Sequence, residues 1–436
     1  MSQSFLTRTQ PLGPLRQRDT SESSIGLSDI NYFRNVPIRA GVKAFILPCH
    51  NEAADLPAAL ESIKNQVGAT VDTILVVSDN STDDTVAIAR AAGVSVIETS
   101  GNHFKKAGAL NAGIRHLMEA GSLPEFIITG DGDTEYDAHF VGRSLSVMRA
   151  TPRLGVLSAV CFGKTGLVTL PRWSQLFSTP QHVVAQRPSV RSVIFTLLTF
   201  IVLFGQWLKA CVDYALVWMQ QAEYTRAASL RLRHNIHTMS GAGSMLRAEA
   251  VIDVLSSNLQ PGEKIDWKQV KLYREHHANL VEDFALTLDV KRVGWQCTNN
   301  FYVVARTDLM RDFTTLIRQR VRWVRGTIDE LRRRKYSRES RASTWTVIYG
   351  VAMIPLMYLL NSYIVMILVR GSFNILDFWM LPLMGLYQAI MVKKMGWKSM
   401  IIAFVLVPEM LYAVMRHSWI IISISKSFTS ATQQWE

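Results

Sequence analysis

A carboxylate-rich turn directly follows an apolar run, and its residue types suit a metal site. Residues 127–137 read IITGDGDTEYD. In extended backbone, residues two apart point to the same side, so Asp131 and Asp133 can face one point while Gly130 and Gly132 permit a tight turn. Two oxygen ligands at this spacing suit Mg²⁺ or Mn²⁺, which shares its remaining positions with water and phosphate oxygens. The turn therefore predicts a cation site that holds a diphosphate.

Two other interpretations of this turn need comparison. Asp-x-Asp turns are common, and taken alone a solvated loop with helix-capping carboxylates is the more frequent case. An EF-hand does not fit, because Tyr136 stands where that loop requires Gly and Gly142 stands where it requires Glu. The surrounding motifs must therefore decide between a metal site and a solvated loop.

The chain around the turn predicts strands that alternate with helices. We expect strands over residues 42–47, 73–77, 94–98 and 126–129, and helices over residues 55–66, 83–92 and 107–120. A capping box from Ser81 to Asp84 would open the second helix. This succession predicts an α/β fold with a doubly wound, mainly parallel sheet. Ligands bind beyond the C-terminal ends of such strands, and three polar clusters fall there, at residues 49–52, 78–83 and 131–133.

Charge and cysteine content indicate a membrane surface and a reducing compartment. Lys and Arg outnumber Asp and Glu by 47 to 35, which gives a net charge of +12. The basic residues are densest over residues 311–341, directly before an apolar run, and this placement favours membrane lipids. Aromatic–basic interleaving is sparse, so we expect no nucleic-acid partner. The four cysteines form no C-x-x-C pair, which favours a cytoplasmic body.

A series of runs over residues 42–326 resembles, in order, the blocks of family 2 glycosyltransferases with a GT-A fold. The runs are LPCHNEAADLPAALESI, VVSDNSTDDT, KKAGALNAGIRHL, TGDGDT, SGAGSMLRAEAV, VEDFALTLDVKRVGW and QRVRW. The last three resemble the membrane-bound branch that includes cellulose, chitin and hyaluronan synthases. The resemblance implies a nucleotide-sugar donor, expected to be UDP-linked, a Mg²⁺ or Mn²⁺ cofactor, and a lipid, glycan or protein acceptor.

The resemblance also implies a role for each matched residue. The donor-binding residues would be Glu52, Asp79, Lys106, Asp131 and Arg322. The metal ligands would be Asp131 and Asp133. The acceptor-binding residues would be Glu282, Gln319 and Trp323. Asp283 would be the general base that deprotonates the acceptor hydroxyl. Without the resemblance, Glu52, Asp79 and Asp283 would be ordinary helix caps or first-turn acids, and Trp323 would be a packing residue.

Composition divides the chain into three regions. We expect a flexible cytoplasmic tail without a signal peptide over residues 1–37. A GT-A domain is expected over residues 38–335 and a membrane region over residues 336–436. Candidate spans at residues 344–369, 375–392 and 400–424 predict two to three transmembrane helices. Lysines at 393, 394 and 398 place their loop in the cytoplasm with the catalytic body, giving a multi-pass membrane protein.

An apolar insertion over residues 193–218 lies inside the predicted catalytic region. A single crossing would put the two halves of the site on opposite membrane faces, so we expect an interfacial segment, a re-entrant one, or packing against the C-terminal helices. A paired double crossing remains open.

Two further motifs are set aside. Residues 158–165 mimic a phosphate loop, but Ser158 replaces its first Gly. The histidines at 234, 237, 276 and 277 lack a third metal ligand and are expected at the surface or in an acceptor groove. The combined expectation is an inverting glycosyltransferase at the cytoplasmic membrane face, adding one sugar or building a polysaccharide. The alternative is a non-catalytic, membrane-anchored scaffold with a glycosyltransferase-like fold.

Overall fold

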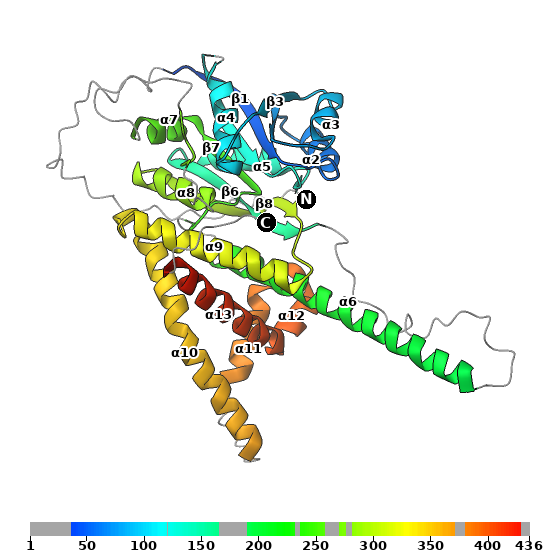
Figure 1. Ribbon diagram of the computed structural model, residues 1–436. Helices are drawn as coiled ribbons and strands as arrows, with labels where there is room; N and C mark the ends of the chain where they lie inside the picture. Colours follow the sequence, from blue (N-terminus) through cyan, green and yellow to red (C-terminus); the bar gives the residue numbers. More distant parts are fainter. Residues whose placement is uncertain are drawn as a thin grey trace, which may run out of the picture.

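An α/β body and a group of C-terminal helices make up the protein in a computed structural model (Figure 1). The structure describes residues 36–119, 121–164, 190–231, 236–257, 270–275, 281–370 and 380–428. The expected tail over residues 1–37 therefore lies almost wholly outside the described residues, as do His234, His276 and His277.

A mixed sheet of eight strands forms the centre of the body. Its order is β3-β2-β1-β4-β7-β6-β8-β5. The strands are β1 (Ile38–Cys49), β2 (Thr73–Asp79), β3 (Ser95–Thr99), β4 (Leu123–Gly130), β5 (Glu135–Tyr136), β6 (Leu154–Gly163), β7 (Gly243–Arg247) and β8 (Gln296–Thr307). Strands β3, β2, β1 and β4 run parallel, whereas β7 runs antiparallel to both β4 and β6.

The predicted α/β class is confirmed, but the sheet is mixed where we expected a mainly parallel one. Gly243, the first residue of β7, pairs with Gly130, the last residue of β4. The chain thus reaches β7 at the edge where the parallel strands end, and it can only run back against them. The short strand β5 is also antiparallel to its neighbour β8.

Helices cover both faces of the sheet. They are α2 (Leu56–Lys64), α3 (Thr85–Ala91), α4 (Lys105–Glu119), α5 (Phe140–Ala150), α7 (Ala248–Ser257) and α8 (Glu282–Arg292). Alternate residues of β1 point to opposite faces. Ala44 and Ile46 pack in the cluster with α4, α7 and α8, whereas Phe45 and Leu47 pack in the cluster with α2, α3 and α5. Burial on both faces explains why the buried parts of the central strands, residues 44–47 of β1 and 75–77 of β2, are apolar without alternation.

The predicted capping box at the start of α3 is wrong. The N-cap of α3 is Asp84, and its side chain makes no capping hydrogen bond. Asp83 caps the helix instead, because its Oδ1 accepts a hydrogen bond from the backbone N of Thr85 at 3.1 Å. Its Oδ2 accepts from the backbone N of Ala53 at 3.0 Å. Asp83 thereby joins the start of α3 to the polar cluster after β1. Ser81 lies against that cluster too, with its Oγ accepting from the backbone N of Asn51 at 3.3 Å.

The remaining long helices lie beneath the body, with α9 next to the sheet (Figure 1). They are α6 (Val190–Arg231), α9 (Phe313–Arg333), α10 (Arg341–Arg370), α11 (Met380–Met391), α12 (Trp397–Phe404) and α13 (Val407–Phe428). Within the described residues, one stretch, Leu198–Ala228 of α6, is long and apolar enough to cross a membrane, and α12 with α13 would count as a second although they are bent by 71°. The expected two to three C-terminal spans therefore stay a prediction.

Helix α6 is a single helix with two different environments. Residues 193–218 contain no turn, and the helix projects away from the body at its N-terminal end (Figure 1). There Leu198, Ile201 and Val202 are 57%, 62% and 57% exposed. Nearer its C-terminal end, Trp218 Nε1 donates to Ser399 Oγ at 3.1 Å, so this half of α6 packs against the C-terminal helices.

Ion pairs tie that half of α6 to the rest of the helical group. Glu223 Oε2 on α6 accepts from Arg320 Nη2 of α9 and from Tyr412 OH of α13, each at 2.7 Å. Arg226 of α6 forms an ion pair with Glu409 of α13. These contacts place this part of α6 against protein.

Candidate functional site

The ends of three neighbouring parallel strands bring the predicted site residues to one edge of the sheet. In the parallel register, Cys49 at the end of β1 pairs with Ser78 of β2, and Ile46 pairs with Thr129 of β4. A cavity of about 1170 Å³ opens there. All the residues predicted as site residues line it: Glu52, Asp79, Lys106, Asp131, Asp133, Glu282, Asp283, Gln319, Arg322 and Trp323.

Three carboxylates crowd one wall of this cavity. Burial and the nearby Asp133 raise the pKa of Glu52 to about 7. Burial and the nearby Asp131 raise the pKa of Asp133 to about 6. Both shifts mean that protein groups alone leave this negative charge poorly compensated. A divalent cation at Asp131 and Asp133 would compensate it, so the donor set fits the expected metal.

A metal ion at Asp131 and Asp133 would need further ligands from the substrate. Within the part of the chain that the structure describes, no group of three or more His, Cys, Asp or Glu side chains is placed to hold a metal ion. Mg²⁺ and Mn²⁺ accept such a site when one or two carboxylates are joined by water and phosphate oxygens. A metal here would therefore bind together with a diphosphate, and it would supply positive charge to that group.

Lys106 links the metal turn to the opposite wall. It is the second residue of α4, and its Nζ lies 2.5 Å from Asp131 Oδ1 and 3.7 Å from Glu282 Oε1. Burial alone would lower the pKa of Lys106, but Asp131, Asp283 and Glu282 outweigh burial and hold the pKa well above its ordinary value. Lys106 is therefore a fixed positive charge between Asp131 and the start of α8.

Asp283 lies in the first turn of α8, whose N-cap is Val281. Burial raises the pKa of Asp283 to about 8, against the lowering effect of Lys106 and with Glu282 and Asp131 adding to the rise. A carboxylate with a raised pKa can accept a proton at neutral pH more readily than an ordinary one, which is what a general base requires. The position inside the cavity and the pKa shift both fit the predicted role.

Helix α9 presents its predicted residues along one face. Gln319, Arg322 and Trp323 are three and four residues apart, a spacing that puts side chains next to one another on a helix. Burial lowers the pKa of Arg322, while Glu282 and Asp131 act in the opposite direction, so this guanidinium lies close to both acids. The guanidinium of Arg320 lies 4.5 Å from the ring centre of Trp323, which fixes the indole at the cavity wall.

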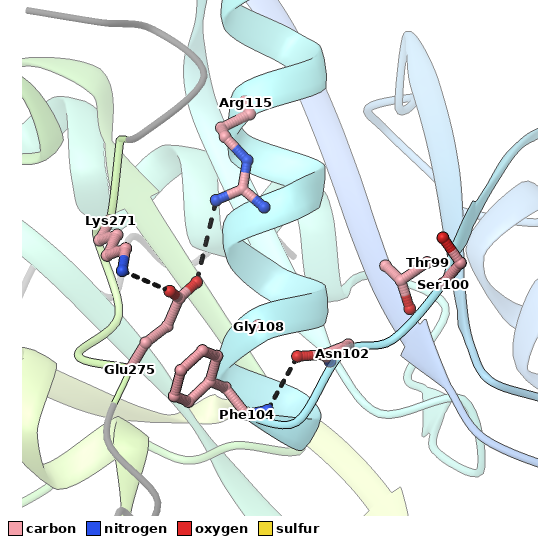
Figure 2. A pocket seen from close by; sticks show the side chains of 8 residues that line it. All are labelled: Thr99, Ser100, Asn102, Phe104, Gly108, Arg115, Lys271 and Glu275. Atoms are coloured by element: carbon pink, nitrogen blue, oxygen red, sulfur yellow. Dashed lines mark hydrogen bonds and ion pairs between the residues drawn. The ribbon is translucent and has the colours of Figure 1, made fainter.

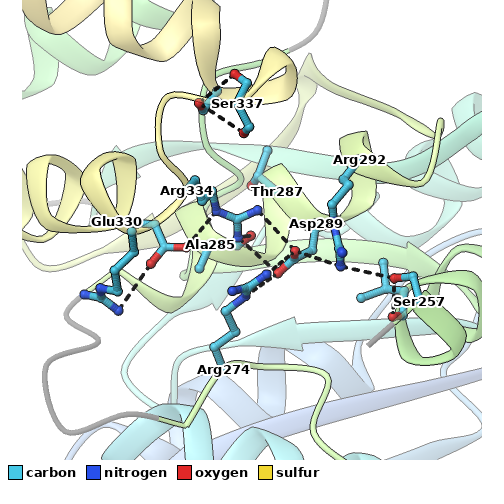
Figure 3. Close-up of polar contacts among 12 residues, drawn as sticks. Ser257, Arg274, Ala285, Thr287, Asp289, Arg292, Glu330, Arg334 and Ser337 are labelled. Carbon is cyan, nitrogen blue, oxygen red and sulfur yellow. Dashed lines mark hydrogen bonds and ion pairs between the residues drawn. The ribbon is translucent and has the colours of Figure 1, made fainter. Parts of the chain in front are cut away.

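A buried ionic cluster, which we define as Asp289, Arg274, Arg334 and Glu330, holds α8 against α9 (Figure 3). Arg274 donates two hydrogen bonds to Asp289, at 2.9 and 2.8 Å. Arg334 Nη2 donates to Asp289 Oδ2 at 3.1 Å, and Arg334 Nε donates to Glu330 Oε1 at 2.7 Å. Although burial favours the protonated form, these two arginines hold the pKa of Asp289 below its ordinary value. The cluster thereby sets the position of α8, which carries the acidic pair of the cavity.

Three further residues, to which the sequence motifs gave no role in the chemistry, lie in or next to the cavity; one of them is His237, which was expected at the surface or in an acceptor groove. His237 lines the cavity and its Nδ1 lies 2.8 Å from Ser343 Oγ of α10. Lys164, from the rejected phosphate-loop motif, has its Nζ 2.7 Å from Asp55 and 3.2 Å from Asp308, so it joins loops at the cavity mouth. Gly241 lies between the two walls, and its carbonyl oxygen is 3.3 Å from Lys106 Nζ. In the sequence, the signal for Gly241 is its place in a G-x-G run at residues 241–243.

Gly241→Ala should lower kcat/KM for transfer by about 10- to 100-fold, because small displacements of reacting groups have effects of this size. An added Cβ would lie 2.7 Å from Lys106 Nζ and would also meet the Asp283 carboxylate, so one of them must move. Steady-state kinetics measure the change. The matched control is Gly205→Ala on α6, where an added Cβ meets nothing within 4 Å and activity should stay normal. Normal kinetics in Gly241→Ala would mean that Lys106 and Asp283 need not stay where they are.

Two family models match this chain. The model described as glycosyl transferase family 2 matches residues 44–255, and the model described as glycosyl transferase family group 2 matches residues 194–422. A search of curated protein sequences finds no match.

Solved structures show likeness in fold. The mannosyltransferase PcManGT from Pyrobaculum calidifontis, in complex with GDP-Man and Mn²⁺, is 13% identical, with 89% of this chain and 87% of that chain covered and a TM-score of 0.50. S. aureus TarS 1-349 in complex with UDP-GlcNAc is 13% identical, with 66% of each chain covered and a TM-score of 0.38. Glucosyl-3-phosphoglycerate synthase from Mycobacterium tuberculosis, in complex with Mn²⁺, UDP and phosphoglyceric acid, is 16% identical, with 71% and 84% covered and a TM-score of 0.36.

These identities are too low to carry more than the fold, and of the three TM-scores only that of the mannosyltransferase reaches 0.5. The family matches do not separate the cellulose, chitin and hyaluronan synthase branch from the rest of the family. They are sufficient for the family itself, because the second match alone spans more than half of the chain. This protein belongs to the family 2 glycosyltransferases and is a glycosyltransferase.

Proposed function

We propose that the protein moves a sugar from a nucleotide-sugar, UDP-linked as the first choice, to a hydroxyl acceptor, with inversion at the anomeric carbon. The observation that carries the proposal is the single cavity in which the carboxylate turn of β4, the Lys106 ammonium and the acidic pair of α8 face one another. The donor diphosphate would lie at Asp131 and Asp133, and the acceptor hydroxyl would lie at Asp283.

Each residue has a definite task in this mechanism. Asp283 takes the proton from the acceptor hydroxyl as its oxygen attacks the anomeric carbon. Lys106 and Arg322 oppose the negative charge that grows on the departing diphosphate, and they do so from fixed positions in a partly buried site. The metal at Asp131 and Asp133, when bound, neutralises part of the same charge. Gln319 and Trp323 on α9, with Glu282 on α8, form the wall against which the acceptor is held.

The choice of donor base rests on Asp79 at the end of β2. A carboxylate can only accept hydrogen bonds, so it pairs with a base edge that presents an N–H group. Uracil and guanine present such a group, whereas cytosine and adenine present an unprotonated ring nitrogen at the equivalent position. Glu52 would lie beside the same nucleoside. We place UDP-sugars first and include a GDP-sugar in the test.

Asp133→Asn should reduce metal-dependent release of UDP at least about 100-fold, since loss of several kcal/mol of charge stabilisation has this effect on rate. The assay uses detergent-purified protein, a panel of UDP-sugars with GDP-mannose, and Mg²⁺ or Mn²⁺. Removal of the metal with EDTA should match the effect of the mutation. Asp137→Asn is the control from the same turn, because Asp137 pairs with Arg143 at 2.8 Å and does not line the cavity. Release from no donor, with or without membrane extract, would favour a non-catalytic scaffold.

The acceptor side of the cavity continues past Asp283 toward α10. Phe284, Thr346 and Val347 line it there, and α10 exposes large apolar side chains such as Trp345 and Tyr349. This placement supports an acceptor that approaches along the helical group, and it favours a lipid or a glycan over a protein. Product length on a labelled donor decides between a single transfer and polysaccharide synthesis: one added sugar would exclude a processive enzyme.

We further propose that the protein is attached to a membrane by the first half of α6 and by the C-terminal helices, with the catalytic body in the cytoplasm. The exposed apolar side chains of α6 and the basic residues of α9 support this orientation. Alkaline carbonate should leave the protein in the membrane pellet. Protection of the body from protease added to intact cells, and cleavage after lysis, would follow from a cytoplasmic body, whereas cleavage in intact cells would contradict it.

A further inference from the structure

The Asp79 carboxylate is bound on one oxygen only. Its Oδ1 accepts from Thr99 Oγ1 at 2.7 Å, from Asn102 Nδ2 at 2.9 Å and from Asn80 Nδ2 at 3.0 Å. All the side-chain hydrogen bonds that the described residues make to this carboxylate fall on Oδ1. A carboxylate has about four lone-pair positions on its two oxygens, so Oδ1 is fully used and Oδ2 is left to accept from a ligand. Asp79 is only 8% exposed and lines the large cavity.

Asn102 connects this carboxylate to the start of α4. Its Nδ2 also donates to the carbonyl oxygen of Lys105 at 2.8 Å, and its Oδ1 accepts from the backbone N of Phe104 at 2.9 Å (Figure 2). Lys105, the first residue of α4, has a φ of 53°, a conformation that needs such support. Lys106, which contacts Asp131, is the next residue. One side-chain amide thus touches both the Asp79 carboxylate and the backbone that carries Lys106.

Two further observations show that the position of Asn102 is tightly defined. An added Cβ on Gly108 of α4 would lie 2.7 Å from Asn102 Cγ and 2.8 Å from its Nδ2, so the amide fits directly against the helix. Asn102 also forms part of a second, outer cavity of about 560 Å³, together with Thr99 and Gly108 (Figure 2). Asn102 therefore separates the outer cavity from the large one, since it lines both. Its contact with Gly108 leaves the side chain no room to move toward α4.

We propose that Asn102 is a positioning residue that orients Asp79 Oδ2 for the donor nucleobase and couples base recognition to the start of α4. The proposal rests on the proposed function. A carboxylate held in this way cannot turn its occupied oxygen toward the ligand. A base that presents an N–H group can donate a hydrogen bond to Asp79 Oδ2. A base that presents an unprotonated ring nitrogen cannot, because that nitrogen and Oδ2 are both acceptors and would face each other. Asn102 thereby determines how strongly the site discriminates between UDP and CDP.

Asn102→Asp removes both donations of Nδ2, to Asp79 and to the carbonyl oxygen of Lys105, and keeps the Oδ1 that accepts from the Phe104 backbone N. It therefore tests the two linked contacts together, and the second variant below tests the support of Asp79 alone. Because a hydrogen bond to a charged group is lost, we expect UDP to bind about 10- to 100-fold more weakly in the presence of Mn²⁺. We also expect the ratio of CDP to UDP dissociation constants to fall toward one, and KM for the donor to rise more than kcat falls.

Thr99→Val is the second variant, since it removes one donor from Asp79 Oδ1 without touching α4. It should lower the same CDP-to-UDP ratio by a smaller factor. Ser100→Ala is the matched control, because Ser100 lines the outer cavity but does not bond to Asp79, and its ratio should equal that of the wild type. Isothermal titration with UDP and CDP gives both constants, and thermal unfolding of each variant reports on the fold.

An unchanged CDP-to-UDP ratio in folded Asn102→Asp would overturn the proposal, even if kcat falls. If Asn102→Asp does not fold, Thr99→Val decides, and an unchanged ratio there would overturn it equally. The failure of the proposed function has a different signature: the wild type itself would bind neither UDP nor GDP with Mn²⁺. A wild type that binds UDP but does not discriminate against CDP would contradict the role given to Asp79 and with it the role given to Asn102.

Discussion

Asp283→Asn is expected to lower kcat/KM for glycosyl transfer by about 10²- to 10⁴-fold, the usual contribution of a positioned general base. The amide has the shape of the carboxylate but cannot accept the proton of the acceptor hydroxyl. Transfer of a labelled sugar to the acceptor measures the effect. UDP binding should change little, because Asp283 faces the acceptor in the proposed arrangement and Asp79 with the metal turn holds the donor.

The pH dependence of the wild type provides an independent check on the same residue. Burial raises the pKa of Asp283 to about 8, so the protonated form, which cannot act as a base, increases as the pH falls through that value. The rate constant kcat/KM for the acceptor should therefore fall as the pH drops through the pKa of Asp283, and Asp283→Asn should lose this limb. A bound cation at Asp131 offsets one of the charges that raise this pKa, so saturating metal should move the limb to lower pH. Near-normal transfer by a folded Asp283→Asn would mean that another group is the base, and Glu282 would be the next to test.

Asp289→Ala is expected to lower the free energy of unfolding by about 3 to 5 kcal/mol, the usual effect of removing one member of a buried ion pair. The Asp289 side chain is fully buried, and Arg334 beside it is only 5% exposed. Without Asp289, three arginines that pair with it, Arg274, Arg292 and Arg334, would lose that partner, while Arg334 would keep its contact with Glu330. Denaturant unfolding in detergent, followed by intrinsic fluorescence, measures the change.

Two variants separate the charge of Asp289 from its shape and location. Asp289→Asn keeps the side-chain volume and one acceptor oxygen, so it should be less damaging than Asp289→Ala. Asp72→Ala is the control for an ion pair near the surface, because Asp72 is 43% exposed and lies 2.8 Å from Lys43; such pairs contribute at most about 1 kcal/mol. If Asp289→Ala unfolded like the wild type, the ionic cluster would not be what holds α8 against α9.

The sequence by itself determined the local pattern of the body and the members of the cavity. Apolar strands, helices of the right spacing and polar residues at strand ends are all encoded over a few neighbouring residues. Parallel strands place those ends at one edge, which is why Glu52, Asp79 and Asp131 could be expected to meet. Asp131 and Asp133 alone are compatible with a solvated loop as well as with a metal site, and it is the surrounding runs that favour the metal site.

Only the tertiary structure decided the features that depend on contacts between distant segments. The antiparallel course of β7 follows from where the chain returns to the sheet edge, which no local pattern encodes. The support of Asp79 by Asn102 joins residues 23 positions apart, and the approach of Gly241 to Lys106 joins residues 135 positions apart. The same holds for α6: its apolar sequence is compatible with an interfacial segment, a re-entrant segment, a double crossing or packing against the C-terminal helices, and the contacts of Glu223 and Arg226 pack the second half of the helix against α9 and α13. Sequence determines which groups are available, and the packing of distant segments determines which of them face the same point.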